Sequence, residues 1–589
     1  MTPDARPVRV FTGPHLVAMA MRAAPWVCLI LLWHLARQYA WITEDAFINF
    51  RVIDHLLAGL GPDWNVGERV QVYTSVLWMA GSALLTWLVG SPIEAAWLLS
   101  LALVAATVLG LWRLSGRYVV LGVLMTVAWA SSHSVRDYLC SGLETPLVMA
   151  AVVWALIRLE PTPTPADPAA RVRQVGGAMA LCALVRHDLL VLLWPLAAQA
   201  AWPAWRQLGW QKAWRQGMVG AWPLLAWSAW SWLYHGSPVP NTARAKVAEG
   251  WDSLAQAGHY FAYMQGFDPL AYALMLAAVA AAWASRSRLM WPLCLGLLSF
   301  ALYLMHIGGD YMAGRFFIGP VTFSVAVLAR VLHQAWHEGL FPWPSTASSP
   351  RWQAGALAFT LGGFAATTWL ADPPSPLVPI PNALAHGIAD ERLYYWSATD
   401  LSTLRTLGVT PRLRANAQAI GQAMQADAHA GPFLTCTIGM TGYFAPSQAI
   451  IIDPLALSDR FLAGLPPRSD NFRVGHVERA VPADYLASRV SGQNRFRDPV
   501  LAAYYDDVQQ VVSGPLWSMA RLGAIWRLSS GSYTERLAAW GPQDGGGAMV
   551  LPSATPRERQ LGCLGSWQRV MRARQNQGQI TLDAIGSPR

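Results

Sequence analysis

The sequence predicts a polytopic α-helical membrane protein with a soluble C-terminal domain. Of its 589 residues, 54% are hydrophobic and only 13% are charged, whereas about 25% of the residues in an ordinary soluble domain are charged. Apolar runs fill residues 1–371, and short basic loops separate them. The formal net charge of +9 therefore indicates cytoplasmic loops that follow the positive-inside rule, not a nucleic-acid-binding patch. The composition also excludes disordered, collagen-like and disulfide-rich proteins.

The apolar runs define the membrane-spanning part of the chain. The first run extends from Pro25 to Ala40, and no small-residue cleavage site follows it, so it is predicted to be a retained anchor. A spanning helix needs about 20 largely apolar residues. Further apolar stretches lie at 73–90, 94–112, 118–131, 144–158, 175–185, 189–205, 218–234, 267–284, 289–306, 315–332 and 352–371.

Basic residues in alternate loops orient these spans. They are Arg171 and Arg173, then Arg206, Lys212 and Arg215, then Arg286 and Arg288, then Arg351. With these loops in the cytoplasm, loops 41–72, 132–143, 186–188, 235–266 and 306–315, and everything after 371, lie on the other side. Loops 41–72 and 132–143 are both predicted on this other side, so the chain between them must cross the membrane an even number of times. Three apolar stretches lie between these two loops. One helix within 73–112 is therefore expected to lie on the surface or re-enter, which leaves about eleven spans.

Residues 372–589 are predicted to form a separate domain. A Pro-rich segment from Asp372 to Pro381 predicts a stiff linker. The remainder mixes amphipathic helical stretches with short β-like runs, which predicts a small α/β or α+β domain. The helical stretches are Ala415–Ala428 and Pro499–Val512, and the β-like runs are Phe433–Ile438 and Ala449–Ile452.

Several motifs of this domain carry weaker signals. Gly439-Met440-Thr441-Gly442 predicts a turn rather than a nucleotide loop, because no strand–GxGxxG–helix unit surrounds it. Asp453 and Asp459 are read as structural turn residues. Cys436 and Cys563 either form a disulfide or stay free, since spacing alone cannot decide. No Cys/His spacing predicts a zinc site.

Polar residues cluster at the ends of apolar runs on the outer face. A charged group next to hydrocarbon is costly and is normally paired, hydrated in a cavity or functional. Each cluster alone is equally well explained by a snorkelling contact with lipid headgroups, but five on one face predict the wall of an extracytoplasmic cavity. The clusters are Glu44–Asp45, Arg136–Asp137 with Glu144, Arg186-His187-Asp188, Asn241 with Arg244 and Lys246, and Asp310 with Arg315.

These residue types suggest roles. Adjacent carboxylates such as Glu44 and Asp45 supply one group for acid/base work and a second that binds a metal or tunes a pKa; the alternative is a hydrated loop start. Basic side chains suit a phosphate, or else pair with the nearby acids. The predicted phosphate ligands are Arg186, Arg244, Lys246 and Arg315, and the predicted pocket residues are Glu144, His187, Asp188, Asn241 and Asp310.

The first outer loop resembles that of a known family. The run from Glu44 to Arg51, continuing through Trp64–Ser75, is similar to the mycobacterial terminal β-(1→2)-arabinofuranosyltransferases and their proteobacterial relatives, which include a pilin arabinosyltransferase. The resemblance extends from about 41 to 490. Further matches are Ser141–Leu147, Arg186-His187-Asp188, Pro240-Asn241-Thr242 with Lys246, Gly308–Phe316, Asp453–Asp459 and Gly475–Glu478.

Two positions depart from the family pattern. The family usually has Asp-Asp at Glu44–Asp45 and Arg-Pro-Asp at Arg186-His187-Asp188. Glu44 keeps the first position acidic. Arg186 and Asp188 keep both charges of the second motif.

The resemblance implies a GT-C membrane glycosyltransferase with about eleven transmembrane helices. Such an enzyme moves a pentofuranose, here D-arabinofuranose, from a polyprenyl-phosphate donor to a periplasmic glycan or protein acceptor. Asp45 is implied to be the principal carboxylate and Glu44 its partner. The implied location is the bacterial inner membrane, with the active site and the C-terminal domain facing the periplasm. No cofactor and no metal site are predicted, although a divalent metal is compatible with this class.

Other readings stay open. Asp45 acts as a base if the reaction inverts, or as a nucleophile if it retains configuration. The donor sugar is alternatively that of an aminoarabinose–lipid A or protein O-mannosyl transferase. A transporter ranks lower, because no internal repeat is evident and the polar groups do not gather at the midplane.

Overall fold

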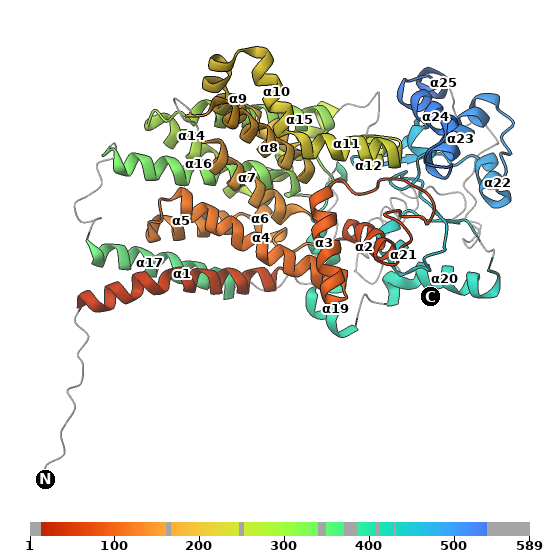
Figure 1. The fold of residues 1–589 in the computed structure, drawn as a ribbon. Helices are drawn as coiled ribbons and strands as arrows, with labels where there is room; N and C mark the ends of the chain where they lie inside the picture. Colours follow the sequence, from red (N-terminus) through yellow and green to blue (C-terminus); the bar gives the residue numbers. More distant parts are fainter. Residues whose placement is uncertain are drawn as a thin grey trace, which may run out of the picture.

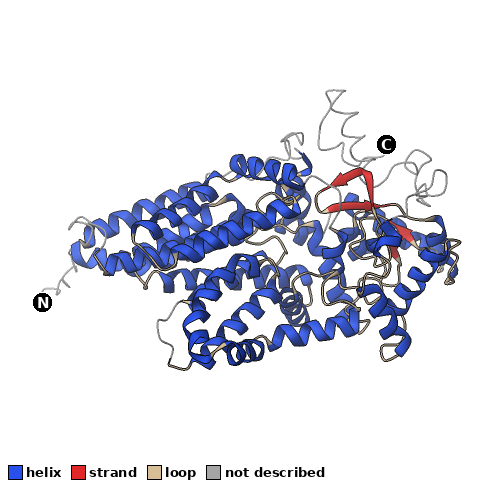
Figure 2. Cartoon of the chain, turned by 90° about the horizontal axis from the view of Figure 1, so that it is seen from above, coloured by secondary structure: helices blue, strands red, loops and turns tan. Residues whose placement is uncertain are grey.

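The chain folds almost entirely into α-helices, as the sequence predicts. The computed structural model describes residues 13–160, 166–246, 253–339, 349–369, 386–407, 411–428 and 431–538. Figure 2 shows helices throughout, and the two short pairs of strands lie towards one end of the molecule in this view.

Long helices lie side by side and make up one half of the molecule (Figure 1). One long helix of the structure covers most of each predicted apolar stretch. In chain order these helices are α1 (Gly13–Gln38), α3 (Val76–Val89), α4 (Pro92–Leu114), α5 (Val119–Ser131), α7 (Thr145–Leu159), α8 (Pro168–Val185), α9 (Leu189–Leu208), α11 (Trp222–His235), α14 (Pro269–Ala284), α15 (Met290–Ile307), α16 (Ile318–His337) and α17 (Pro350–Trp369). Shorter or more polar helices occur between them: α2 (Glu44–Leu57), α6 (His133–Asp137), α10 (Trp210–Gly220), α12 (Asn241–Ala245), α13 (Ser253–Phe267) and η1 (Arg315–Phe317).

The structure supports several membrane spans but not a count of eleven. By length and composition alone, four described helices can cross a membrane: Val17–Gln38, Pro92–Leu114, Met290–Ile307 and Arg315–His337. A fifth span results if α13 and α14, which meet at a 95° bend, are counted as one. Several of the remaining apolar helices are shorter than the roughly 20 residues of an untilted span.

One apolar helix does not follow the others. In Figure 1, α3 runs across the direction of α1 and α4. Its Trp87 and Leu88 side chains are exposed. The surface-lying or re-entrant helix expected within 73–112 stays a prediction.

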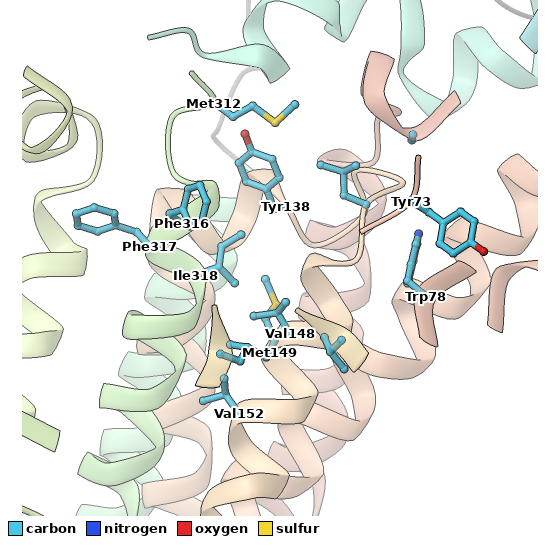
Figure 3. Packing of buried hydrophobic residues seen from close by; sticks show 14 of the residues in the cluster. Tyr73, Trp78, Tyr138, Val148, Met149, Val152, Met312, Phe316, Phe317 and Ile318 are labelled. Atoms are coloured by element: carbon cyan, nitrogen blue, oxygen red, sulfur yellow. The ribbon is translucent and has the colours of Figure 1, made fainter. Parts of the chain in front are cut away.

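The core of the helical half centres on α16, whose residues are mostly buried. Figure 3 shows Val148, Met149 and Val152 of α7 beside Ile318 of α16, with Tyr138 above them. All five side chains are at most 5% exposed. Burial of this apolar surface fixes α7 and α16, whose N-terminal ends follow Glu144 and Arg315.

The distal part of the chain contains the predicted helices and strands. Its elements are α18 (Glu391–Thr399), α19 (Leu401–Leu407), α20 (Pro411–Ala426), β1 (Phe433–Leu434), α21 (Ile438–Phe444), β2 (Ile451–Ile452), η4 (Leu462–Gly464), β3 (Pro467–Arg473), β4 (His476–Arg479), α22 (Ala483–Ser491), α23 (Pro499–Val512), α24 (Met519–Ser529) and α25 (Thr534–Ala538). Strands β1 and β2 pair in parallel, and β3 and β4 form an antiparallel hairpin. The predicted boundary at 371/372 lies outside the described residues.

Backbone pairing joins the distal part, the described residues from 386 to 538, to the loops that contain Trp41 and Tyr311. The amide of Ala389 donates to the Tyr311 carbonyl at 2.7 Å, and the amide of Ala313 donates to the Ala389 carbonyl at 2.9 Å. A second bridge links Trp41 to Asp400. A side chain joins α2 to the distal part. The buried Arg51 guanidinium of α2 donates to the carbonyl of Trp64 and to the carbonyls of several residues between 442 and 449.

The cysteine prediction is tested only in part. Cys436 is disulfide-bonded, whereas Cys563 lies outside the described residues. Cys28, Cys140, Cys182 and Cys294 are free. Cys28 in α1 and Cys182 in α8 are buried, as small apolar side chains in a helical core.

Candidate active site

The acidic pair Glu44–Asp45 forms the first turn of α2. The preceding backbone is held on both sides: the Thr43 amide donates to Ser141 and the Ile42 amide to Thr399, both at 3.0 Å. Unpaired amides at a helix N-terminus favour negative charge. The helix start therefore presents both carboxylates at the junction of the helical half and the distal part.

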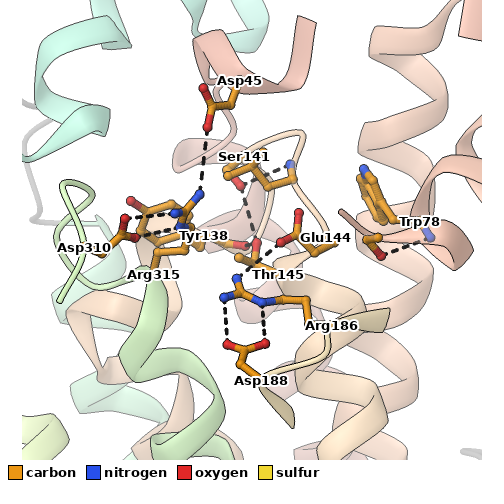
Figure 4. Close-up of polar contacts among 12 residues, drawn as sticks. Asp45, Trp78, Tyr138, Ser141, Glu144, Thr145, Arg186, Asp188, Asp310 and Arg315 are labelled. Atoms are coloured by element: carbon orange, nitrogen blue, oxygen red, sulfur yellow. Dashed lines mark hydrogen bonds and ion pairs between the residues drawn. The ribbon is translucent and has the colours of Figure 1, made fainter. Parts of the chain in front are cut away.

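Asp45 lies at one edge of a polar cluster, where its carboxylate points towards Arg315 (Figure 4). Its Oδ2 accepts a hydrogen bond of 2.6 Å from the Tyr311 hydroxyl and lies 3.9 Å from Arg315 Nη1. Burial by itself raises the pKa of Asp45, but the positive charges of Lys246 and Arg315 and the Tyr311 hydrogen bond outweigh it and lower the pKa. Asp45 is therefore ionised at neutral pH.

Arg315 and Lys246 supply positive charge beside Asp45. Arg315 forms a bidentate pair with Asp310, with N–O distances of 2.7 and 2.9 Å. The Lys246 ammonium lies 5.5 Å from the centroid of the Tyr311 ring. Burial lowers the pKa of Lys246, while Asp45 opposes that shift. Tyr311 keeps its proton, because burial and Asp45 raise its pKa well above the usual range.

Arg186 forms a second ion-pair group next to the first. Its Nε and Nη2 donate to the two oxygens of Asp188 at 3.0 and 2.8 Å, and its Nη1 donates to Glu144 at 3.2 Å. Phe316 lies between the two groups, with its ring centroid 4.7 Å from the Arg186 guanidinium and 5.5 Å from that of Arg315. Seven of the predicted site residues besides Glu44 thus share one region: Asp45, Glu144, Arg186, Asp188, Lys246, Asp310 and Arg315.

Glu44 differs from Asp45 although the two are adjacent. Its Oε1 accepts a hydrogen bond of 3.1 Å from the Met440 amide of α21. Burial raises the pKa of Glu44 to about 8, and the neighbouring Asp45 charge adds to the shift. The pair therefore holds one protonated and one ionised carboxyl group at neutral pH.

Three predicted site residues lie elsewhere. Asn241 donates from Nδ2 to the carbonyls of Ala456 and Leu457 at 2.8 and 3.1 Å, so its amide holds a distal loop and does not line the cluster. Arg244 contacts the Ser237 hydroxyl and lies near Arg460 and Tyr504. The His187 side chain is exposed. Polarity at the end of an apolar run marks all three, but it does not show which way a side chain points.

The structure adds residues that sequence reasoning did not single out. Tyr311 contacts Asp45, Lys246 and Arg315. The ring of His476, from the distal part, lies edge-on to Tyr311 with 4.2 Å between centroids. Both residues lie in motifs that carry the family resemblance, and this is the signal that marks them.

The predicted turn at Gly439–Gly442 is wrong, because these residues belong to α21. A Cβ on Gly439 would lie 2.0 Å from the Glu44 carbonyl oxygen, and one on Gly442 would lie 2.4 Å from the Trp64 ring. Gly439 allows α21 to approach α2 closely, and Gly442 makes room for the Trp64 ring of the loop after α2, so neither glycine signals a turn. Asp453, in contrast, accepts hydrogen bonds from the Leu455 and Leu457 amides, as a turn residue does.

One group of described residues has the composition of a metal site. Ligand atoms of His133, Asp137 and Asp390 lie within 4.8 Å of one another. Arg392 already pairs with Asp137 at 3.4 Å, and His133 Nε2 lies 3.2 Å from the same carboxylate. Both contacts are to the Asp137 carboxylate, so one of the three candidate ligands already has partners within the protein.

Comparison with known proteins relates the chain to two transferases. It is 27% identical over 410 residues to the terminal β-(1→2)-arabinofuranosyltransferase of Mycobacterium tuberculosis, covering 62% of this chain and 63% of that protein. It is 29% identical over 379 residues to the Corynebacterium glutamicum protein of the same name, covering 56% and 54%. The predicted resemblance to the arabinofuranosyltransferases is confirmed. The chain spans less than two thirds of the length of either arabinofuranosyltransferase. No family model and no solved structure matches.

Proposed function

We propose that the protein is a membrane glycosyltransferase that moves an arabinofuranosyl group from a polyprenyl-phosphate donor to a periplasmic glycan or protein. The meeting of ionised Asp45 with Lys246 and Arg315 supports this proposal most directly. The likeness to arabinofuranosyltransferases supports the sugar class. The site and the distal part face the periplasm of a bacterial inner membrane in this proposal.

The cations serve the phosphate of the donor. Lys246 offers a point charge, and Arg315 offers a guanidinium edge turned towards Asp45. Arg186 already forms ion pairs with Asp188 and Glu144. We therefore assign phosphate binding to Lys246 and Arg315, and we assign to Arg186 the neutralisation of Asp188 and Glu144.

The reaction breaks the bond between the sugar C1 and the phosphate oxygen. The leaving polyprenyl phosphate keeps the electron pair, and the two cations stabilise its added negative charge. In an inverting reaction Asp45 takes the proton of the acceptor hydroxyl as its oxygen bonds to C1. In a retaining reaction Asp45 bonds to C1 as the phosphate leaves. The acceptor oxygen then bonds to C1, the Asp45 carboxylate leaves with the electron pair, and the acceptor proton passes to the released polyprenyl phosphate. Both routes require the ionised form of Asp45.

The architecture proposed for the whole chain is of GT-C type. It has about eleven spans in residues 1–371 and a periplasmic domain in residues 372–589. The contacts of α21 and of the β3–β4 hairpin with the site support a role for that domain in completing it. No metal is assigned to the reaction.

A transfer assay tests the proposal. Purified protein is given synthetic polyprenyl-phosphate arabinofuranose and an arabinan acceptor, with polyprenyl-phosphate aminoarabinose and mannose donors in parallel. We expect turnover of the arabinofuranose donor, and a loss of at least about a thousandfold in Asp45→Asn. Turnover of another donor alone would overturn the sugar assignment. Full activity of a folded Asp45→Asn variant would remove Asp45 from its role, and the anomeric configuration of the product decides between the two routes.

A further inference from the structure

The tip of the β3–β4 hairpin lies against Tyr311. Gly475 adopts φ +73°, and a Cβ at this position would lie 2.4 Å from Tyr311 Cδ1. A side chain at 475 would therefore displace the tyrosine ring or the hairpin. The glycine allows the hairpin backbone to touch a residue that contacts Asp45.

His476 follows at the start of β4 and completes this contact. Its ring meets the Tyr311 ring at 85°, with 4.2 Å between centroids. Aromatic pairs favour this edge-to-face arrangement. With its ring confined by His476 and by the Gly475 backbone, Tyr311 is held so that its hydroxyl reaches Asp45 Oδ2 at 2.6 Å.

The other end of the same hairpin fixes Lys246. The buried Arg479 donates from Nη1 to the Ala245 carbonyl at 2.5 Å, one residue before the lysine. The Arg479 amide donates to the Pro454 carbonyl at 2.9 Å. The hairpin is therefore tied to the distal part and to two segments of the site at once.

We propose that His476 is a positioning residue for the proposed transfer reaction: its ring holds Tyr311 in the orientation that donates to Asp45. The inference rests on the proposed function for its activity readout. It assigns to the distal part a direct contribution to the active site, through one side chain. Electrostatics support the placement: burial raises the pKa of Asp45, whereas Lys246, Arg315, Tyr311 and His476 all lower it.

Two substitutions at one position test the role of the ring. His476→Ala removes the ring, whereas His476→Phe keeps a planar ring that can still meet Tyr311 edge-on. We expect His476→Ala to lower kcat about ten- to a hundredfold with little change in the donor KM, and His476→Phe to restore most of kcat. Equal loss in both variants, or wild-type kcat in His476→Ala, would overturn the proposal.

A control and a second readout separate this inference from the function itself. Phe496→Ala removes a ring that packs on Phe461 and Tyr505, so it reports general loosening of the distal part. Hydrogen–deuterium exchange over 308–316 needs no substrate. We expect faster exchange there in His476→Ala than in wild type, His476→Phe or Phe496→Ala. If the wild type fails to turn over the donor, the proposed function is wrong. Unchanged exchange over 308–316 in His476→Ala would contradict the positioning role, whatever the result of the transfer assay.

Discussion

The Tyr311 hydroxyl and the Asp45 carboxylate share a hydrogen bond of 2.6 Å across 266 residues of sequence. The bond joins the helix that follows the first apolar run to the loop before α16. Because the tyrosine stays protonated and the aspartate ionised, the bond has a fixed direction from hydroxyl to carboxylate. Tyr311 therefore contributes to both the geometry and the ionisation of the proposed reactive group.

Loss of that hydrogen bond should change the pH dependence of transfer. In Tyr311→Phe the ionised form of Asp45 loses a donor, so its pKa rises and the acid limb of kcat/KM moves to higher pH. At neutral pH we expect a loss of about tenfold. Tyr533→Phe is the matched control, since Tyr533 donates a bond of the same length to Asp507; a shift in both profiles, or in neither, would contradict the prediction.

Glu44 should be replaceable by its neutral isostere. Its pKa is raised to about 8, because burial disfavours the charge, so the folded state loses stability as pH rises from the unfolded pKa towards 8. Glu44→Gln keeps an acceptor for the Met440 amide and lacks this penalty. We expect its Tm to exceed the wild-type Tm by a margin that widens from pH 5 to 8. Glu535→Gln, at an exposed position of α25, should show no trend, and a pH-independent margin at 44 would refute the assignment.

Lys246 and Arg244 should separate in a donor titration, although only one residue lies between them. Lys246 lies beside Tyr311 and near Asp45, whereas Arg244 contacts Ser237. Lys246→Gln should raise the donor KM about tenfold or more, and Arg244→Gln should leave it near the wild-type value. The reverse order would mean that the phosphate binds at the end of α12 nearer to Arg460.

Asn241 should affect stability rather than donor affinity. Its amide donates to distal carbonyls from a buried position, so Asn241→Ala leaves acceptors unpaired at a cost of about 1–3 kcal/mol. We expect a lower Tm and an unchanged donor KM in the residual folded protein. Asn494→Ala provides the comparison, because that exposed amide also makes two hydrogen bonds but loses little when water replaces them. A raised KM in Asn241→Ala with a normal Tm would return this residue to the pocket.

Hydropathy and charge predicted much of this molecule because they are local properties. Each apolar stretch became a helix, and the pair Glu44–Asp45 was marked by its place after the first run. The difference between the two carboxyl groups was not local. Burial keeps Glu44 protonated, whereas Lys246, Arg315 and Tyr311, all far along the chain, keep Asp45 ionised.

Side-chain direction was the property that the sequence could not supply. Asn241 and Lys246 belong to one short segment, yet one holds a distal loop and the other approaches the tyrosine ring. Gly439 and Gly442 looked like turn residues because glycine is common in turns. In the structure they lack a side chain for another reason: Gly439 packs against the α2 backbone and Gly442 against the Trp64 ring.

The bridge between Met312 and Ala389 has an evolutionary consequence. Its bonds join main-chain atoms of Tyr311, Ala313 and Ala389 only, and every residue type except proline offers the same donor and acceptor. Substitutions other than proline can therefore accumulate at 311–313 and at 389 without breaking these backbone hydrogen bonds. The loop at 311–313 and the segment at 389 can stay paired in homologues whose sequences at these positions differ.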